Sequence, residues 1–335
     1  MKKMRKTSLT EALNALTEGH RVFAPTGEAE RLAFTLIDAE NAQEANLIGL
    51  PVLPPKEMLL PRSETLYSIG LGSGEVSQPE KAEKTVLFGI RPCDARAIVN
   101  LDNAFLEKTY VDSAYADRRE QLTLVSLACA TIPERTCFCD SMGGSPQGVE
   151  GADMMLTDTK DGETWLVTAL TGKGKAIEEL WMEAGLLNEA GKLTAAKSPS
   201  CTLKAGKPDD LAEKLANAFE DPAWTGLSEA CIGCGTCSFI CPTCYCFDMN
   251  MEKRGGKAAQ FRCWDCCMFS DYSRMAGGHD PRPTKKERLR NRYLHKLSYF
   301  DERYGRTLCV GCGRCLAKCP AGLDIVSVIE WGGTL

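Results

Sequence analysis

The sequence predicts an α+β protein, with an N-terminal α/β domain built on a small mixed sheet and a mostly helical C-terminal domain. Cysteine content divides the chain, since five of its 18 cysteines lie in residues 1–230 and thirteen in residues 231–335. Charge divides at the same place: the first part has 24 Lys and Arg against 35 Asp and Glu, and the second has 16 against 10. We therefore expect two domains, residues 1–200 and 201–335.

The first 80 residues contain small elements without recognisable chemistry. Leucines recur on one side of residues 8–18, which predicts an amphipathic helix, and residues 21–25 predict an extended segment. Residues 50–61 contain four prolines and predict an irregular surface connection. The glycines of residues 70–74 lack the spacing of a phosphate-binding loop, so we interpret them as a flexible turn.

A strand–helix–strand unit comes next. The apolar residues 86–90 and 122–127 predict two buried strands, and the helix between them is expected to begin with Asp94 as its N-cap. Its apolar face carries Ile98, Leu101 and Phe105. In such a unit the two strands lie parallel, with their carboxyl ends at one edge of the sheet.

The α/β domain is predicted to close with a hairpin and a helix. Residues 154–156 and 164–170 read as strands joined around Asp161-Gly162, and a helix carrying Ile177 and Trp181 ends near Gly185. Residues 185–210 form the expected linker, and apolar residues from Leu211 to Phe219 predict a helix leading into the second domain.

Composition excludes several classes of protein. With 44% hydrophobic and 25% charged residues, long disorder is not expected, and no apolar run is long enough to span a membrane. The first residues are basic but lead into a polar helix start, not a secretory signal. We therefore expect a cytoplasmic protein whose thiols are reduced or bound to metal.

The most specific signal is a cysteine run that occurs twice. Residues 231–242 and 309–320 both follow the pattern C-x2-C-x2-C-x3-C-P. Three thiolates at this spacing bind one [4Fe–4S] cluster, and in two-cluster proteins the fourth cysteine binds the other cluster. The expected ligand sets are Cys231, Cys234, Cys237 and Cys319 for the first cluster, and Cys309, Cys312, Cys315 and Cys241 for the second.

Two zinc ribbons would also use C-x2-C pairs. A third cysteine two residues on and a trailing Cys-Pro, both repeated, favour the clusters, and three histidines supply mixed zinc sites poorly. The 67 residues between the runs favour a larger, helical ferredoxin domain. The basic character of this domain suits compensation of anionic clusters better than it suits nucleic-acid binding.

Four further cysteines form a weaker set, namely Cys93, Cys129, Cys137 and Cys139. The first two follow the predicted parallel strands, so they are expected to meet at the carboxyl edge of the sheet, where ligands of α/β proteins bind. Free cysteines are also common small core residues. We favour a third [4Fe–4S] cluster at this edge.

The sequence does not assign a role to the remaining cysteines. A further cluster, a zinc ion or core thiols would each explain Cys244, Cys246, Cys263, Cys266 and Cys267. Cys201 is interpreted as an isolated thiol. Residues 282–306 contain nine Lys and Arg, for which a solvated helix face is the default interpretation, with docking of an acidic partner or charge balance for the clusters as alternatives.

The sequence resembles iron–sulfur electron-transfer subunits, a family that includes the sulfhydrogenase beta subunit and the anaerobic sulfite reductase A subunit. Related chains serve flavin oxidoreductases that feed heterodisulfide reductases. The resemblance begins near residue 56 and is carried, besides the two cysteine runs, by the segments Gly89–Arg96, Cys137–Gly143, Cys241–Phe247 and Met275–His279.

The resemblance implies an electron relay in anaerobic metabolism, without catalytic residues of its own. Its partners would be a FAD- and NAD(P)H-binding oxidoreductase subunit and a hydrogenase, sulfite reductase or heterodisulfide reductase subunit. Cys244, Cys246 and Cys267 match family positions and are candidate metal ligands, whereas Cys263 and Cys266 look like additions in this sequence. An enzyme acting on a sulfur or disulfide substrate, and a redox-sensing regulator, are the alternative functions.

Overall fold

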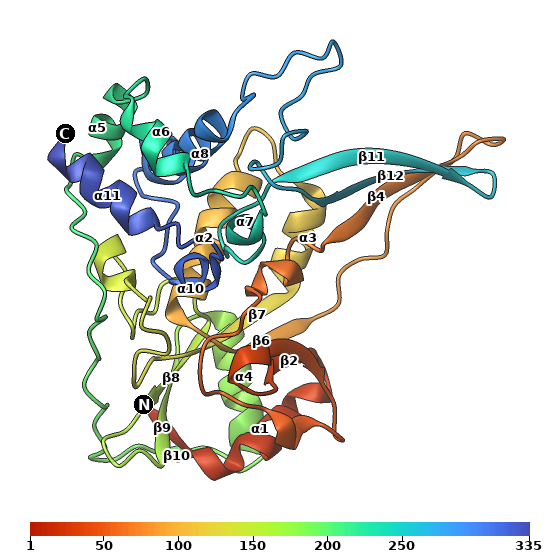
Figure 1. Cartoon of the computed structure of the whole chain (residues 1–335). Coiled ribbons are helices and arrows are strands. Elements are labelled where there is room, and N and C mark those ends of the chain that lie inside the picture. Colours follow the sequence, from red (N-terminus) through yellow and green to blue (C-terminus); the bar gives the residue numbers. More distant parts are fainter.

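Two β-sheets organise the chain in a computed structural model that describes residues 1–28 and 30–335 (Figure 1). The larger is an eight-stranded mixed sheet in the order β10 (Asn188–Glu189), β1 (Lys2–Arg5), β9 (Thr164–Ala169), β8 (Met154–Asp158), β7 (Leu122–Leu127), β6 (Thr85–Ile90), β2 (Arg21–Thr26) and β3 (Ala33–Ile37). The four strands from β8 to β2 are parallel to their neighbours, and the outer pairings are antiparallel. The expected mixed sheet is therefore present, although it is larger than predicted.

Both faces of this sheet are covered by helices. Val86 and Phe88 of β6 face a core shared with α1 (Leu9–Thr17) and α4 (Gly172–Glu183), while Leu87 packs with α2 (Pro92–Phe105) and α3 (Ser113–Gln121) on the other face. Burial on both faces explains why β6 is a continuous apolar run instead of an alternating one.

The helix α2 begins earlier than predicted. Its N-cap is Arg91, and Pro92 occupies the first turn, where a missing backbone N–H costs nothing. Cys93 consequently lies within the first helical turn and not in a loop after the strand. Asp94 is not the N-cap, and its fully buried carboxylate instead accepts two hydrogen bonds from Arg314.

The C-terminal part contains short helices and one long hairpin. The helices are α5 (Leu211–Asn217), α6 (Ala223–Ser228), α7 (Thr236–Phe239), α8 (Lys285–Leu294), a π-helical turn His295–Tyr299, α9 (Phe300–Tyr304), α10 (Arg314–Lys318) and α11 (Ile325–Thr334). They pack around Trp224, Leu294 and Ile329. None of the described helices combines the length and apolar character needed to cross a bilayer.

The hairpin is the longest of the elements that the sequence analysis did not predict. Its strands β11 (Phe247–Arg254) and β12 (Lys257–Trp264) extend a sheet completed by β4 (Ser63–Gly70) and β5 (Val76–Ser77). It projects from the body of the molecule in Figure 1, and every residue of β11 is exposed. Because β12 pairs with β4, this sheet combines strands from both parts of the chain.

Residues 50–61 are irregular, as expected, but they do not lie on the surface. The aliphatic side chain of Leu59 is fully buried, and the Lys56 ammonium is buried against the cysteine-rich part of the chain. Its Nζ donates hydrogen bonds to the carbonyl oxygens of Ser238 (3.2 Å) and Cys244 (2.8 Å). The four prolines therefore shape a contact between the two parts of the chain.

Candidate metal centres

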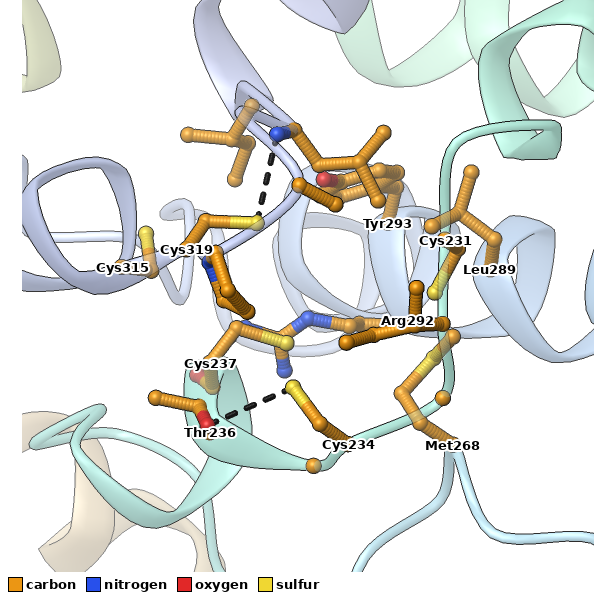
Figure 2. A pocket seen from close by; sticks show the side chains of 17 residues that line it. Cys231, Cys234, Thr236, Cys237, Met268, Leu289, Arg292, Tyr293, Cys315 and Cys319 are labelled. Atoms are coloured by element: carbon orange, nitrogen blue, oxygen red, sulfur yellow. Dashed lines mark hydrogen bonds between the residues drawn. The ribbon is translucent and has the colours of Figure 1, made fainter.

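The first centre lies where the Cys231 run meets the end of the second run. One cavity is lined by Cys231, Cys234, Cys237 and Cys319, and their sulfurs face a common space (Figure 2). The run turns into α7 at Gly235, and Cys319 follows α10 directly, so each segment presents its thiols beside a helix end. The structure thus brings together the four residues predicted for the first cluster.

The surroundings of this first centre suit an iron–sulfur cluster. Met268, Leu289 and Ile325 provide an apolar lining, and none of the described lining residues is acidic. The backbone N–H of Leu323 donates to the sulfur of Cys319 at 3.2 Å. Such hydrogen bonds to ligand sulfurs help to set cluster potentials. The donor set of four thiols in an apolar shell fits a [4Fe–4S] cluster.

The second centre is formed by the Cys309 run and by Cys241, the last cysteine of the first run. Burial raises the pKa of Cys309, Cys312 and Cys315, and the nearby Cys241 thiol raises each of them further. Buried thiols in this state stay protonated unless a metal or cation stabilises the thiolate. These four residues therefore share one electrostatic environment.

The third set also gathers around a single cavity. Cys93, Cys129, Cys137 and Cys139 all line it, together with Arg91 and with Cys312 of the second centre. Cys93 comes from the first turn of α2 and Cys129 from the loop after β7, so the parallel strands bring them to one sheet edge as predicted. Burial raises the pKa of Cys137 to about 12. Four thiols around one cavity fit a third cluster.

The second and third centres are in direct contact. The Cys137 thiol lies 3.6 Å from the carbonyl oxygen of Cys312, and the backbone N–H of Phe138 donates to Gly311 at 2.9 Å. Gly311 and Gly313 have φ values of +66° and +78°, and a Cβ on either would come within 2.6 Å of the backbone of residues 136–138. Only glycine permits so close an approach of the two segments.

Cys201 is not the isolated thiol that the sequence suggested. Its sulfur lies 3.7 Å from the sulfur of Cys139, and both side chains are buried in a cluster with Cys137. The segment that carries it runs along one side of the molecule (Figure 1) and is held there by Asp140, whose Oδ2 accepts from the backbone N–H of Cys201 at 3.0 Å. The expected linker is therefore anchored at this point.

The basic residues of 282–306 also differ from the solvated helix face that the sequence suggested. Arg292 and Lys296 point into the protein and are about 3% exposed, so they do not form a solvated face. Arg292 donates to the sulfur of Cys244 at 3.1 Å, and Lys296 donates to the sulfur of Cys241 at 3.2 Å. Burial opposes these charges, but the neighbouring thiolates outweigh it and raise the pKa of both side chains.

The insertion between the runs brings two pairs of thiols together. Cys246 and Cys267 are hydrogen-bonded, which lowers the pKa of Cys246 to about 6 and raises that of Cys267. Cys244 lies beside Cys241, and this contact raises its pKa. Of the three candidate ligands of the insertion, Cys244 therefore adjoins the second centre.

The last two insertion cysteines lie elsewhere. Cys266 is buried, with its sulfur 3.9 Å from the carbonyl oxygen of Gly235, and Cys263 is half-buried on β12. Among the described residues, no group of three or more His, Cys, Asp or Glu side chains is arranged for a single metal ion.

Comparison with known proteins accounts for the first two centres. Residues 230–323 match the family described as the 4Fe-4S dicluster domain, and this range includes all eight cysteines of the two repeated runs. The chain is 31% identical over 336 residues to sulfhydrogenase 2 subunit beta of Pyrococcus furiosus, an alignment that covers 98% of this chain and 97% of that protein. The chain belongs to the iron–sulfur subunit family of the sulfhydrogenase beta subunit.

Membership of this sulfhydrogenase beta family confirms the resemblance drawn from the motifs and makes the chain an iron–sulfur electron-transfer subunit. Cys201 and the four cysteines of the third set lie outside the matched range, although Gly311 and Cys312 within it also line the third cavity. No solved structure matches the chain.

Proposed function

We propose that this chain relays electrons through three [4Fe–4S] clusters, held by the three cysteine sets described above. One partner would be a subunit that oxidises NAD(P)H through FAD, and the other a hydrogenase, sulfite reductase or heterodisulfide reductase subunit in the cytoplasm. The proposal rests on one observation, namely that the three cysteine sets adjoin one another in one protein. Electron transfer through them needs no separate acid–base pair. The clusters, when bound, supply the redox change.

The order of the centres follows from the second cysteine run. Cys312 lines the third cavity, and Cys315 lines the first. The second centre therefore lies between the other two, which supports a relay with the order third, second, first. This order joins residues 1–200, which hold most of the third set, to the dicluster domain in residues 201–335.

The chain's own residues would prepare the centres for electron transfer. Arg292 and Lys296 are buried cations that offset the negative charge of the clusters, and a cation near a cluster favours its reduced form. Apolar side chains line part of the first centre. Cys234 and Ile232 are exposed there, with Ile232 66% exposed, which supports contact with a redox partner at this end.

Anaerobic purification of the native complex tests the proposal. We expect about 12 irons per chain, since each cluster has four, and we expect a flavin-binding subunit and a catalytic subunit to co-purify. About 8 irons would contradict the third cluster, and about 16 would indicate a fourth cluster bound by the insertion thiols. Purification without any redox partner, or cluster signals that NAD(P)H does not reduce in the complex, would contradict the relay.

A further inference from the structure

A fifth thiol, that of Cys201, lies against the third cysteine set, in addition to Cys312 of the second centre, which also lines the cavity. Cys93, Cys129, Cys137 and Cys139 line it, and Cys201 contacts this set through Cys139 and Cys137. Cys201 is only 2% exposed, although it comes from the connecting segment between the two parts of the chain. A cubane cluster uses four cysteines, so the fifth needs an explanation.

The distance between the sulfurs of Cys139 and Cys201 indicates what the fifth thiol does. At 3.7 Å, they are too far apart for a disulfide, whose sulfurs lie about 2.05 Å apart. A tetrahedral metal with metal–thiolate bonds of about 2.3 Å holds two of its sulfurs about 3.8 Å apart. We propose that Cys201 is a fifth thiolate ligand of the third centre and binds the same iron as Cys139.

The residues that follow Cys139 in sequence hold this pair of thiols in place. Asp140 follows Cys139 directly, and its Oδ2 accepts hydrogen bonds from the Cys201 backbone N–H (3.0 Å) and from the Lys204 ammonium (2.5 Å). The next residue, Ser141, accepts the backbone N–H of Ala205 at 3.1 Å. One short segment thus presents Cys139 and also anchors the segment that carries Cys201.

A buried arginine at the cavity suits an anionic cluster. Arg91 lines the cavity and is 7% exposed, and its guanidinium donates to the carbonyl oxygen of Gly49 at 2.9 Å. Among the described acidic residues, none forms an ion pair with it. Burying a cation without a carboxylate is costly unless another anion is close. A thiolate-bound cluster in this cavity would provide that anion.

Five thiolates imply a cluster that differs from a cubane. Each iron of a cubane binds three sulfides and one thiolate, so an iron with two thiolates keeps only two sulfides. Binding of Cys201 forms one iron–sulfur bond, breaks one iron–sulfide bridge and releases the thiol proton to solvent, and no electron is transferred. This inference rests on the proposed third cluster and specifies its ligands.

Serine variants in the native complex, purified anaerobically with enriched iron, test the inference. If Cys139 and Cys201 share one iron, Cys201→Ser and Cys139→Ser should each keep about 12 irons per chain, because the remaining thiol still serves that corner as in a cubane. The double variant should fall to about 8. Mössbauer spectra should show a distinct iron site in the unchanged protein that both single variants lose.

Cys263→Ser is the matched control, because Cys263 is half-buried on β12 and belongs to none of the three cysteine sets. Retention of about 8 irons in the double variant would show that the other two centres still fold. The inference would be overturned if Cys139→Ser alone lost about 4 irons while Cys201→Ser left the Mössbauer spectrum unchanged. About 8 irons in the unchanged protein would contradict the third cluster itself, so that failure of the proposed function can be distinguished from failure of the inference about Cys201.

Discussion

Lys296 shows at the scale of one residue how the chain prepares for an anionic cofactor. Its Nζ donates to the sulfur of Cys241 (3.2 Å) and to the hydroxyl of Thr243 (3.0 Å), and no described carboxylate pairs with it. A buried ammonium normally loses its proton or pairs with an anion. Here the burial is offset by Cys241 and Cys244, which raise the pKa of Lys296.

Removing this charge should lower the reduction potential of the second cluster. In Lys296→Met, the reduced cluster loses a nearby positive charge, and we expect its midpoint potential to become more negative by on the order of 50–100 mV. A redox titration followed by electron paramagnetic resonance measures the shift. Lys285→Met on the same helix removes an exposed charge and serves as the control. Equal potentials in the two variants would contradict this role of Lys296.

Cys319 tests the crossed assignment of the ligands. It belongs to the second run in sequence, yet it lines the cavity of the first run. Cys319→Ala should therefore remove or convert the first cluster, with a loss of between about 1 and 4 irons per chain. Electron paramagnetic resonance should show the change in the signal that also responds to Cys231→Ala. If the affected signal is instead the one that responds to Cys309→Ala, the ligands are not crossed.

At the scale of elements, Gly313 allows the second cysteine run to pack closely against the loop of the third set. Gly313 has φ +78°, and a Cβ there would lie 2.4 Å from the carbonyl oxygen of Thr136. Gly305 has a similar φ of +67° but has no neighbour within 4 Å of an added Cβ. Comparing substitutions at Gly313 and Gly305 therefore separates the effect of backbone conformation from the effect of close packing.

Gly313→Ala should be much more destabilising than Gly305→Ala. Both variants force alanine into a left-handed conformation, at a cost of about 1–2 kcal/mol in free energy of unfolding. Gly313→Ala must also push the two segments apart, which adds about 1–3 kcal/mol and should reduce the iron content of the second and third centres. Anaerobic thermal unfolding and iron analysis measure both effects. Equal behaviour of the two variants would rule out the packing explanation.

At the scale of the whole molecule, the buried ion pair of Asp94 and Arg314 is one of the contacts that connect the two parts of the chain. Asp94, in the first turn of α2, accepts two hydrogen bonds from Arg314 of α10 at 2.6 and 2.7 Å. Arg314 also donates to the carbonyl oxygen of Pro51 at 2.8 Å. Burial opposes the charge of Arg314, but Asp94 raises its pKa above the ordinary value. The pair thus fixes the third centre relative to the second.

Breaking this pair on one side should destabilise the protein strongly. Asp94→Asn leaves the Arg314 guanidinium buried without an anion, and we expect a loss of about 3–5 kcal/mol in free energy of unfolding. The double variant Asp94→Asn, Arg314→Met should recover most of it. Asp271→Asn, which breaks an exposed pair with Arg274, should cost less than about 1 kcal/mol. Chemical denaturation of the complex under anaerobic conditions measures all three.

Local patterns predicted the parts of this molecule that depend on local physics. The buried strands β6 and β7 were recognisable because both of their faces are covered, and the cysteine runs because their spacing is set by the shape of a cluster. The hairpin of β11 and β12 was overlooked although its sequence carries the signal: Phe247, Met249 and Met251 alternate with polar residues, and Gly255-Gly256 forms the turn. The start of α2 was misplaced because Asp94, a common N-cap residue, has a tertiary partner.

The sequence by itself determined the chemistry: the number of thiols, the two repeated runs and the mixed α/β framework that presents them. Only the tertiary structure decided which thiols share a cavity, that Lys296 and Arg292 point inward, and that Cys201 contacts Cys139. The reason is that ligand spacing within a run is a local constraint. Contacts between residues 62 positions apart, such as Cys139 and Cys201, depend on how distant segments pack.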